Sequence, residues 1–121
     1  MIEKRLGAVE LRFAEIIWAR APLSSTELVR ICATELDWKK STTYTVLKKL
    51  CERGLFENER GTVRVRVTRE EYDSMQSAQF VDEAFSGSLP AFVAAFTAGK
   101  ALTVEEAEEI RRMIDAFRAE D

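Results

Sequence analysis

Apolar and polar positions recur at helical spacing in three segments near the start of the chain. The first runs from Leu6 to Arg20 and stops at Ala21-Pro22-Leu23, because proline ends a helix. The second follows Ser24, which has Glu27 three positions later, the pattern of a capping box. The third begins near Ser41 and ends at Gly54. Since few residues separate the second and third segments, the pattern predicts a helix-turn-helix.

The spacing of the apolar positions changes after the third helix. Residues 63–67 alternate valine with arginine, which predicts a half-exposed strand. Residues 55–58 predict its partner, and Gly61 lies near the tip of the resulting β-hairpin. Three helices followed by such a hairpin define a winged helix-turn-helix, which we assign to residues 1–69.

Three further helices are predicted in the second half of the chain. One follows Thr68 and extends toward Phe85, and residues 86–90 then break the pattern. A short apolar helix ends at Gly99, and Thr103 caps the last helix. We therefore expect a mainly α fold with a small β-hairpin, in which residues 70–121 form a helical dimerisation domain.

The length and composition exclude several classes of protein. A chain of 121 residues is one ordinary domain or a domain with a short appendage, too short for a barrel enzyme. It has no run of about 20 apolar residues that could span a membrane. The N-terminus is charged and lacks the pattern of a signal peptide. We therefore expect a cytoplasmic protein that does not insert into the membrane.

The sequence has few residues that could act in catalysis or bind a metal ion. The sequence has no histidine, the commonest general base and zinc ligand. Cys32 and Cys51 lack the spacing of a metal site or a disulfide framework, and both stand at apolar positions, which favours buried thiols. We expect no enzyme activity, metal or cofactor.

The net charge of −3 hides an uneven distribution. Residues 1–68 hold 13 basic and 9 acidic residues, whereas residues 69–121 hold 5 basic and 12 acidic ones. A basic first half suggests contact with a polyanion. Ordinary solvated helix faces would explain a difference of this size equally well.

Candidate DNA contacts lie in the third helix and in the hairpin. Short hydroxyl side chains suit close approach to base edges, lysines suit phosphates, and hairpin arginines suit the backbone or minor groove. Helix capping and solubility would explain the same residues in isolation. Their place in a winged helix-turn-helix favours DNA contact. The candidates are Lys39, Lys40, Ser41, Thr42, Thr45, Lys49, Arg60, Arg64 and Arg66.

The second half carries more apolar surface than its short helices can enclose. Five of the seven phenylalanines lie there. A second copy of the chain would cover this surface, since two-fold dimers are the commonest oligomers. The alternative is that the helices fold back onto the winged helix. The candidate dimerisation residues are Phe80, Phe85, Phe92, Phe96, Ile110, Ile114 and Phe117.

Several stretches have a familiar arrangement: Trp18 with Pro22, residues 24–28, Trp38, residues 41–50, and Gly54-Leu55. Together they resemble the penicillinase-repressor family (BlaI/MecI/CopY type) over nearly the whole chain. The core Trp-x-x-x-Thr-x-x-Thr-x-Leu-x-x-Leu is fairly specific to it. The resemblance implies a homodimeric winged-helix repressor that binds a palindromic operator through the third helix and the hairpin.

Three positions depart from the family's pattern. Ser41 stands where many members have lysine. The resistance repressors are cut by a membrane metalloprotease sensor at an Asn-Phe bond, and the matching pair here is Ala95-Phe96. The copper-responsive members end in Cys-x-Cys motifs, whereas this chain ends Arg118-Ala119-Glu120-Asp121. The resemblance implies a membrane metalloprotease sensor as a partner, although the pair that such a sensor would cut is Ala95-Phe96 here. It gives no reason to expect copper sensing.

Two functions from different classes remain. The first is a sequence-specific DNA-binding repressor acting as a homodimer on a palindromic operator. The second is a winged-helix module that contacts other proteins and does not bind DNA. Charge discriminates between them, because a protein-binding module does not need basic residues on both the third helix and the hairpin.

Overall fold

A computed structural model describes residues 5–119, so residues 1–4 of the charged N-terminus and Glu120-Asp121 lie outside it. Within 5–119 there are six helices and three short strands. In chain order these are α1 (Ala8–Arg20), β1 (Leu23–Ser24), α2 (Ser25–Glu35), α3 (Lys40–Glu52), β2 (Phe56–Glu59), β3 (Thr62–Val65), α4 (Arg69–Phe85), α5 (Leu89–Gly99) and α6 (Val104–Phe117). The predicted mainly helical fold with a β-hairpin is confirmed.

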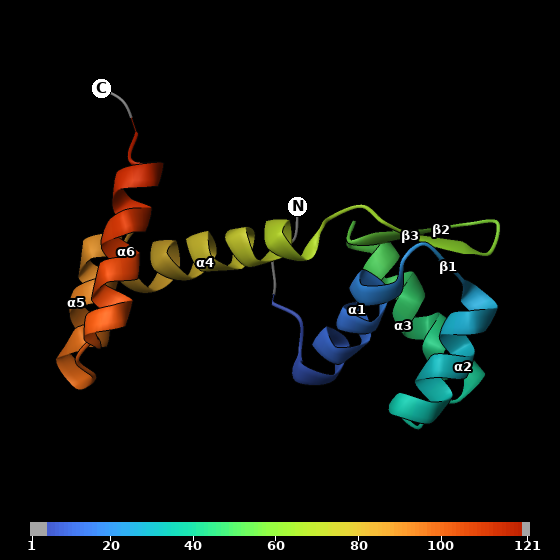
Figure 1. Cartoon of the computed structure of the whole chain (residues 1–121). Coiled ribbons are helices and arrows are strands. Elements are labelled where there is room, and N and C mark those ends of the chain that lie inside the picture. Colours follow the sequence, from blue (N-terminus) through green and yellow to red (C-terminus); the bar gives the residue numbers. More distant parts are fainter. Residues whose placement is uncertain (1–4, 120–121) are drawn as a thin grey trace. The chain divides into compact units, whose positions relative to one another are not determined.

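The first compact unit, Met1–Ser77, contains a winged helix-turn-helix. Helices α1, α2 and α3 pack together, and the sheet lies along one side of them (Figure 1). The sheet is antiparallel in the order β1-β3-β2, with Leu23 opposite Val63 and Phe56 opposite Val65. The strand β1 was not predicted, because two residues are too few to establish an alternating pattern.

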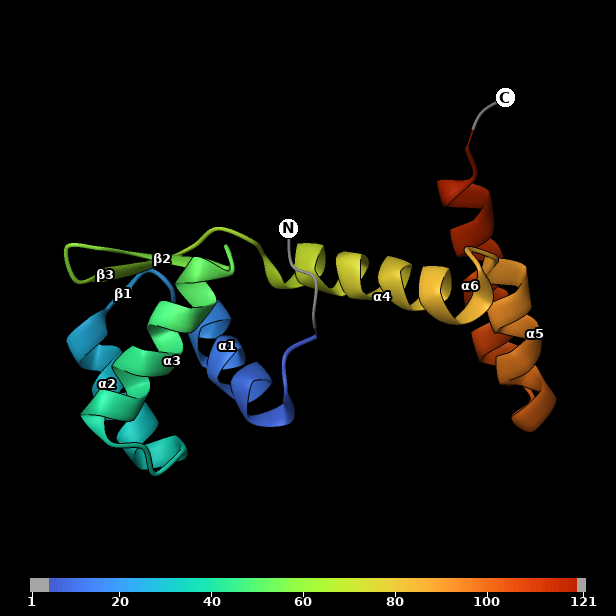
Figure 2. The same cartoon turned by 180° about the vertical axis from the view of Figure 1, so that it is seen from behind.

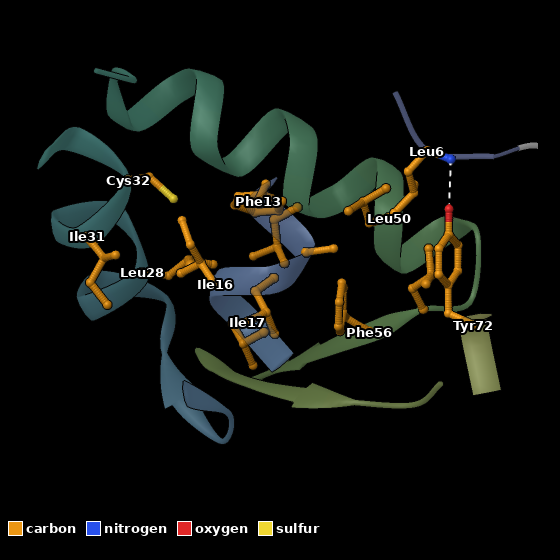
Figure 3. Packing of buried hydrophobic residues seen from close by; sticks show 14 residues of the cluster. Leu6, Phe13, Ile16, Ile17, Leu28, Ile31, Cys32, Leu50, Phe56 and Tyr72 are labelled. Carbon is orange, nitrogen blue, oxygen red and sulfur yellow. Dashed lines mark hydrogen bonds between the residues drawn. The ribbon is translucent and has the colours of Figure 1, made fainter. Parts of the chain in front are cut away.

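The core of this unit lies between the three helices and the sheet (Figure 3). Phe13 and Ile17 of α1, Leu28 of α2, Leu50 of α3 and Phe56 of β2 are almost completely buried. The positions on α1, α2 and α3 follow the helical spacing of the sequence, so burial of their side chains fixes which face of each helix turns outward.

The first turns of α4 pack against the same core. The Tyr72 side chain is buried, and its hydroxyl oxygen accepts a hydrogen bond of 3.0 Å from the backbone N–H of Leu6 (Figure 3). The Trp18 ring lies 5.5 Å from the Tyr72 ring, and its indole N–H donates to the carbonyl oxygen of Val67. The first compact unit extends to Ser77 and so includes the beginning of α4 together with the expected winged helix-turn-helix of residues 1–69.

The hairpin of β2 and β3, which we call the wing, turns through Arg60 and Gly61. Both residues have positive φ, 53° and 84°, as the two central residues of a type I′ turn require. The strand predicted over 63–67 extends beyond the C-terminal end of β3, which lies at Val65. The N–H groups of Arg66 and Val67 donate to the carbonyl oxygen of Leu55, so the chain leaves the ladder after Val65.

The second compact unit, Ala78–Asp121, holds the end of α4 together with α5 and α6. Helices α5 and α6 lie side by side in both views (Figures 1 and 2). Helix α5 begins at Leu89, inside the predicted break over residues 86–90, because Pro90 is tolerated in a first turn, where its missing N–H has no partner to lose. Thr103 and Glu106 form the predicted capping box of α6.

Candidate nucleic-acid interface

The outward face of α3 carries Ser41, Thr45 and Lys48, which are all exposed. Their spacing of four and three residues places them one above another on the helix. The opposite face is fixed by burial, since Thr43 and Leu50 have no exposed area. Lys48 was missed in the sequence analysis, although it follows Thr45 by the three positions that keep side chains on one face of a helix.

Hydrogen bonds within α3 orient its hydroxyl groups. The Thr45 hydroxyl donates to the carbonyl oxygen of Ser41 at 2.9 Å, so its oxygen can still accept hydrogen bonds but has no proton left to donate. The buried Thr43 hydroxyl donates to the carbonyl oxygen of Lys39. Lys39 itself occupies the N-cap position and makes no side-chain capping bond. Ser41 and Thr42 therefore do not cap the helix, and capping does not explain their presence.

The positive end of the α3 dipole coincides with two lysines. Lys39 and Lys40 are exposed at the N-terminus of the helix, where the backbone N–H groups also carry partial positive charge. Thr42, two residues beyond Lys40, is partly buried. This end of α3 therefore attracts anions more strongly than either lysine would alone.

Lys49 lies apart from the stripe of Ser41, Thr45 and Lys48. Its ammonium group is 2.8 Å from a carboxylate oxygen of Glu10 on α1. The guanidinium of Arg53 lies 3.9 Å from the other oxygen of the same carboxylate. The hydrogen bond from Lys49, followed by the one from the Gly7 N–H, lowers the pKa of Glu10 below its usual value of 4.5. Lys49 nevertheless keeps 59% of its side chain exposed.

The wing presents three arginines and two acidic residues. Arg60 stands at the tip, and Arg64 is exposed on β3 opposite Glu57. Arg66 lies after the strand, with its guanidinium 4.0 Å from the Glu57 carboxylate. Glu59 ends β2 beside the tip. Arg66 is thus the wing arginine that forms an ion pair within the hairpin, and acidic residues lie next to Arg60 in sequence and opposite Arg64 in the sheet.

A groove separates α3 from the wing and is lined by Tyr44, Leu47, Lys48, Cys51 and Asn58. Cys51 is half-buried there, and burial raises the pKa of its thiol. Burial likewise raises the pKa of the Cys32 thiol to about 11. Both thiols are therefore protonated near neutral pH and unreactive. Among residues 5–119, no three histidine, cysteine, aspartate or glutamate side chains gather in a way that could hold a metal ion.

The candidate dimerisation residues form one apolar surface in the second unit. The rings of Phe80, Phe85, Phe92 and Phe96 contact one another, with centroids 5.6 to 6.3 Å apart. Ile110 joins them by lining an apolar pocket between α5 and α6. Ile114 and Phe117 extend the surface along α6, exposed by 58% and 82%. No residue of α5 or α6 is fully buried.

The fold and these two surfaces are those of a winged-helix regulator with a helical tail. The profile of the penicillinase repressor family matches residues 6–116, which is most of the chain. A similar curated protein is the methicillin resistance regulatory protein MecI of Staphylococcus aureus. It is 20% identical over 114 residues, which cover 91% of this chain and 93% of MecI. The chain belongs to the penicillinase repressor family, a family of transcriptional regulators.

Within the part of the chain that the structure describes, no helix is both long enough and apolar enough to cross a bilayer.

Proposed function

We propose that this protein is a sequence-specific DNA-binding transcriptional repressor that acts as a homodimer on a palindromic operator. The observation that carries the proposal is the stripe of Ser41, Thr45 and Lys48 on the outward face of the second helix of the helix-turn-helix. In this type of motif that helix, here α3, is the recognition helix and enters the major groove. The family membership supports the regulatory role.

The proposed contacts divide into two chemical kinds. The hydroxyl groups of Ser41, Thr42 and Thr45 are short enough to meet base edges, and Lys48 reaches beyond them. The remaining candidates, Lys39, Lys40, Lys49, Arg60, Arg64 and Arg66, carry charge that suits phosphates. Phosphate contacts supply affinity and orientation, whereas base contacts supply the preference for one sequence. We therefore assign sequence preference to α3 and general affinity to both ends of α3 and the wing.

The second unit supports the proposed homodimer. Large apolar side chains on α5 and α6 remain exposed, and a solvated monomer would leave a large apolar patch. A second copy of residues 78–121 would cover this surface and place two winged helices on one duplex. Each half of a palindrome then contributes contacts, which raises the affinity far above that of one winged helix. A cytoplasmic location follows from this proposed function.

A protein-interaction module without DNA binding is the competing function. The acidic residues Glu57 and Glu59 on the wing favour it, because they repel phosphates. The two functions give different results with DNA of random sequence. A protein-interaction module would select nothing, whereas the proposed repressor enriches one sequence.

The experiment is selection from a library of duplexes with a randomised central segment, using the full chain. The proposed repressor enriches a sequence with two-fold symmetry and binds it far more tightly than a scrambled duplex. Enrichment of no sequence, or equal affinity for the selected and scrambled duplexes, would contradict the proposal.

A further inference from the structure

Ser25 makes one hydrogen bond to the wing tip and another to α3. It is the first residue of α2, and only 7% of it is exposed. Its backbone N–H donates to the carbonyl oxygen of Gly61, at 2.8 Å. Its side-chain oxygen accepts a hydrogen bond of 3.1 Å from the hydroxyl of Tyr44. A single buried residue thus joins α2, the wing tip and α3.

The wing tip is held on both sides of Gly61. Ser24 pairs with Thr62 in the β1–β3 ladder, which aligns the start of α2 with the tip. The Gly61 N–H donates to the side-chain oxygen of Asn58, at 3.1 Å. Arg60 is the residue next to Gly61 and shares its positive φ. The backbone that carries Arg60 is therefore fixed by bonds to α2 and within the wing.

Tyr44 connects this arrangement to the recognition helix. It stands between the buried Thr43 and the exposed Thr45, and its partly buried side chain lines the groove between α3 and the wing. Its hydroxyl bonds to Ser25 rather than to its own helix. This bond restrains the rotation of α3 about its own axis relative to the start of α2.

We propose that Ser25 is a positioning residue for DNA binding, which fixes Arg60 at the wing tip relative to the recognition helix through the chain Tyr44–Ser25–Gly61. This inference rests on the proposed function. Two groups of contacts that must meet one duplex together bind more tightly when their relative position is fixed beforehand. Loss of these hydrogen bonds therefore weakens the contribution of Arg60 to DNA binding without removing any side chain proposed to face DNA.

Three variants break this series of hydrogen bonds, two of them at the Tyr44–Ser25 bond and the third at the Ser25–Gly61 bond as well. Ser25→Ala and Tyr44→Phe each remove the hydroxyl bond alone. Ser25→Pro also removes the N–H bond to Gly61 and places a ring carbon against the Gly61 carbonyl oxygen, which pushes the wing tip away. The backbone of α2 itself accepts proline for two reasons. Proline is favoured at the first position of a helix, and Ser24, with φ −73° and ψ 149°, has the extended conformation required before proline. Thr34→Ala is the matched control, since it removes an exposed hydroxyl from the same helix.

The test is a thermodynamic cycle with Arg60→Ala, measured by fluorescence anisotropy on the duplex that the wild-type protein selects. Arg60→Ala reduces the affinity for this duplex by a certain factor in the wild-type background. We expect that factor to be about fivefold smaller in the Ser25→Pro background, a coupling of ordinary size for residues in one network. Ser25→Ala and Tyr44→Phe should weaken binding equally, and their combination should weaken it no further. An equal loss from Arg60→Ala in both backgrounds would overturn the proposal.

Hydrogen exchange in the free protein provides a second readout that does not depend on DNA. Amides of residues 58–62 should exchange faster in Ser25→Ala, Tyr44→Phe and Ser25→Pro than in the wild type or Thr34→Ala, while amides of α1 stay protected. If the wild type selects no duplex, the proposed function fails, and this exchange still decides the role of Ser25. Unchanged exchange at residues 58–62 in the folded Ser25→Ala and Tyr44→Phe variants would overturn it.

Discussion

The ammonium group of Lys49 lies 2.8 Å from the carboxylate of Glu10. The two residues join α1 to α3, the proposed recognition helix, across the outside of the core. Lys49 is also a proposed phosphate contact, so the Glu10 carboxylate and a DNA phosphate compete for the same ammonium group. Lys49 keeps 59% of its side chain exposed and Glu10 keeps 23%, so a phosphate can approach the ammonium group from its solvated side and compete with the carboxylate.

The substitution Glu10→Gln should therefore strengthen DNA binding. Removing the competing carboxylate should raise the affinity for a scrambled duplex about two- to fivefold, the range expected for an exposed ion pair. Fluorescence anisotropy at several salt concentrations measures the effect. Glu27→Gln is the control, because it changes the net charge equally at a carboxylate paired with Arg30 on α2. Equal gains from both substitutions would show that net charge alone is responsible.

Glu10 should also make the stability of the winged helix depend on pH. Its pKa is lowered in the folded protein, so its pairing stabilises the fold above the ordinary carboxyl pKa of 4.5. That stabilisation should disappear as the pH falls through the lowered pKa of Glu10. Urea unfolding of the wild type and Glu10→Gln should give different free energies at neutral pH and converge in acid. A difference that stays constant across this range would contradict the assignment.

The hydroxyl groups of α3 should determine sequence preference. Replacing Thr42 and Thr45 with alanine should reduce discrimination between the selected and scrambled duplexes, because each good base contact contributes about 1–3 kcal/mol to it. Arg64→Ala should instead weaken binding to both duplexes and reduce the salt dependence. If the threonine variants discriminate as the wild type does, α3 is not the element that contacts the bases.

Ile114 should be part of the dimer interface. Its side chain is 58% exposed in the single chain, so Ile114→Asp costs little unless a partner covers it. In a dimer the substitution buries an unpaired charge. Breaking a buried ion pair leaves a charge in the same situation and costs about 3–5 kcal/mol, so we expect a cost of this order. Sedimentation velocity should show a monomer for Ile114→Asp. Ala116→Asp, an exposed position outside the apolar stripe of α6, should remain dimeric. A monomeric wild type at micromolar concentration would contradict the interface.

The turn between α4 and α5 should be the first site of proteolysis in the tail. Ser86 and Gly87 are exposed residues in a turn, whereas Ala95-Phe96 lies within α5 and is protected by helical hydrogen bonds. Early fragments from limited proteolysis, identified by mass, should end near Gly87. Cleavage at Ala95-Phe96 by a co-expressed membrane metalloprotease would show that alanine in place of asparagine does not prevent release by a sensor of that kind.

The helices and the wing could be predicted because their signals are local. Ser24 and Thr103 cap helices through bonds to residues three positions later, and the alternating 63–67 segment identifies a strand from its own side chains. The two-residue strand β1 has no such signal. It exists because Leu23 and Ser24 pair with β3, almost forty positions further along the chain.

The candidate site was predicted less completely for the same reason. Helical spacing would have added Lys48 to the stripe of Ser41 and Thr45. No local pattern, however, could place Lys49 against Glu10 or Tyr44 against Ser25, because these contacts exist only after α1, α2 and α3 have packed together. Sequence identifies which residues are available on α3, and tertiary packing determines which of them face outward.

Recognition of a specific operator by α3, and repression of transcription by binding there, can be measured together in the cells that contain the protein. The experiment is a genome-wide binding map of the tagged protein, combined with transcript levels after deletion of its gene. We expect discrete peaks that share an inverted repeat, loss of these peaks in the Thr42→Ala, Thr45→Ala double variant, and increased transcripts from the adjacent genes. A map without discrete peaks, or peaks whose adjacent transcripts do not rise on deletion, would contradict it.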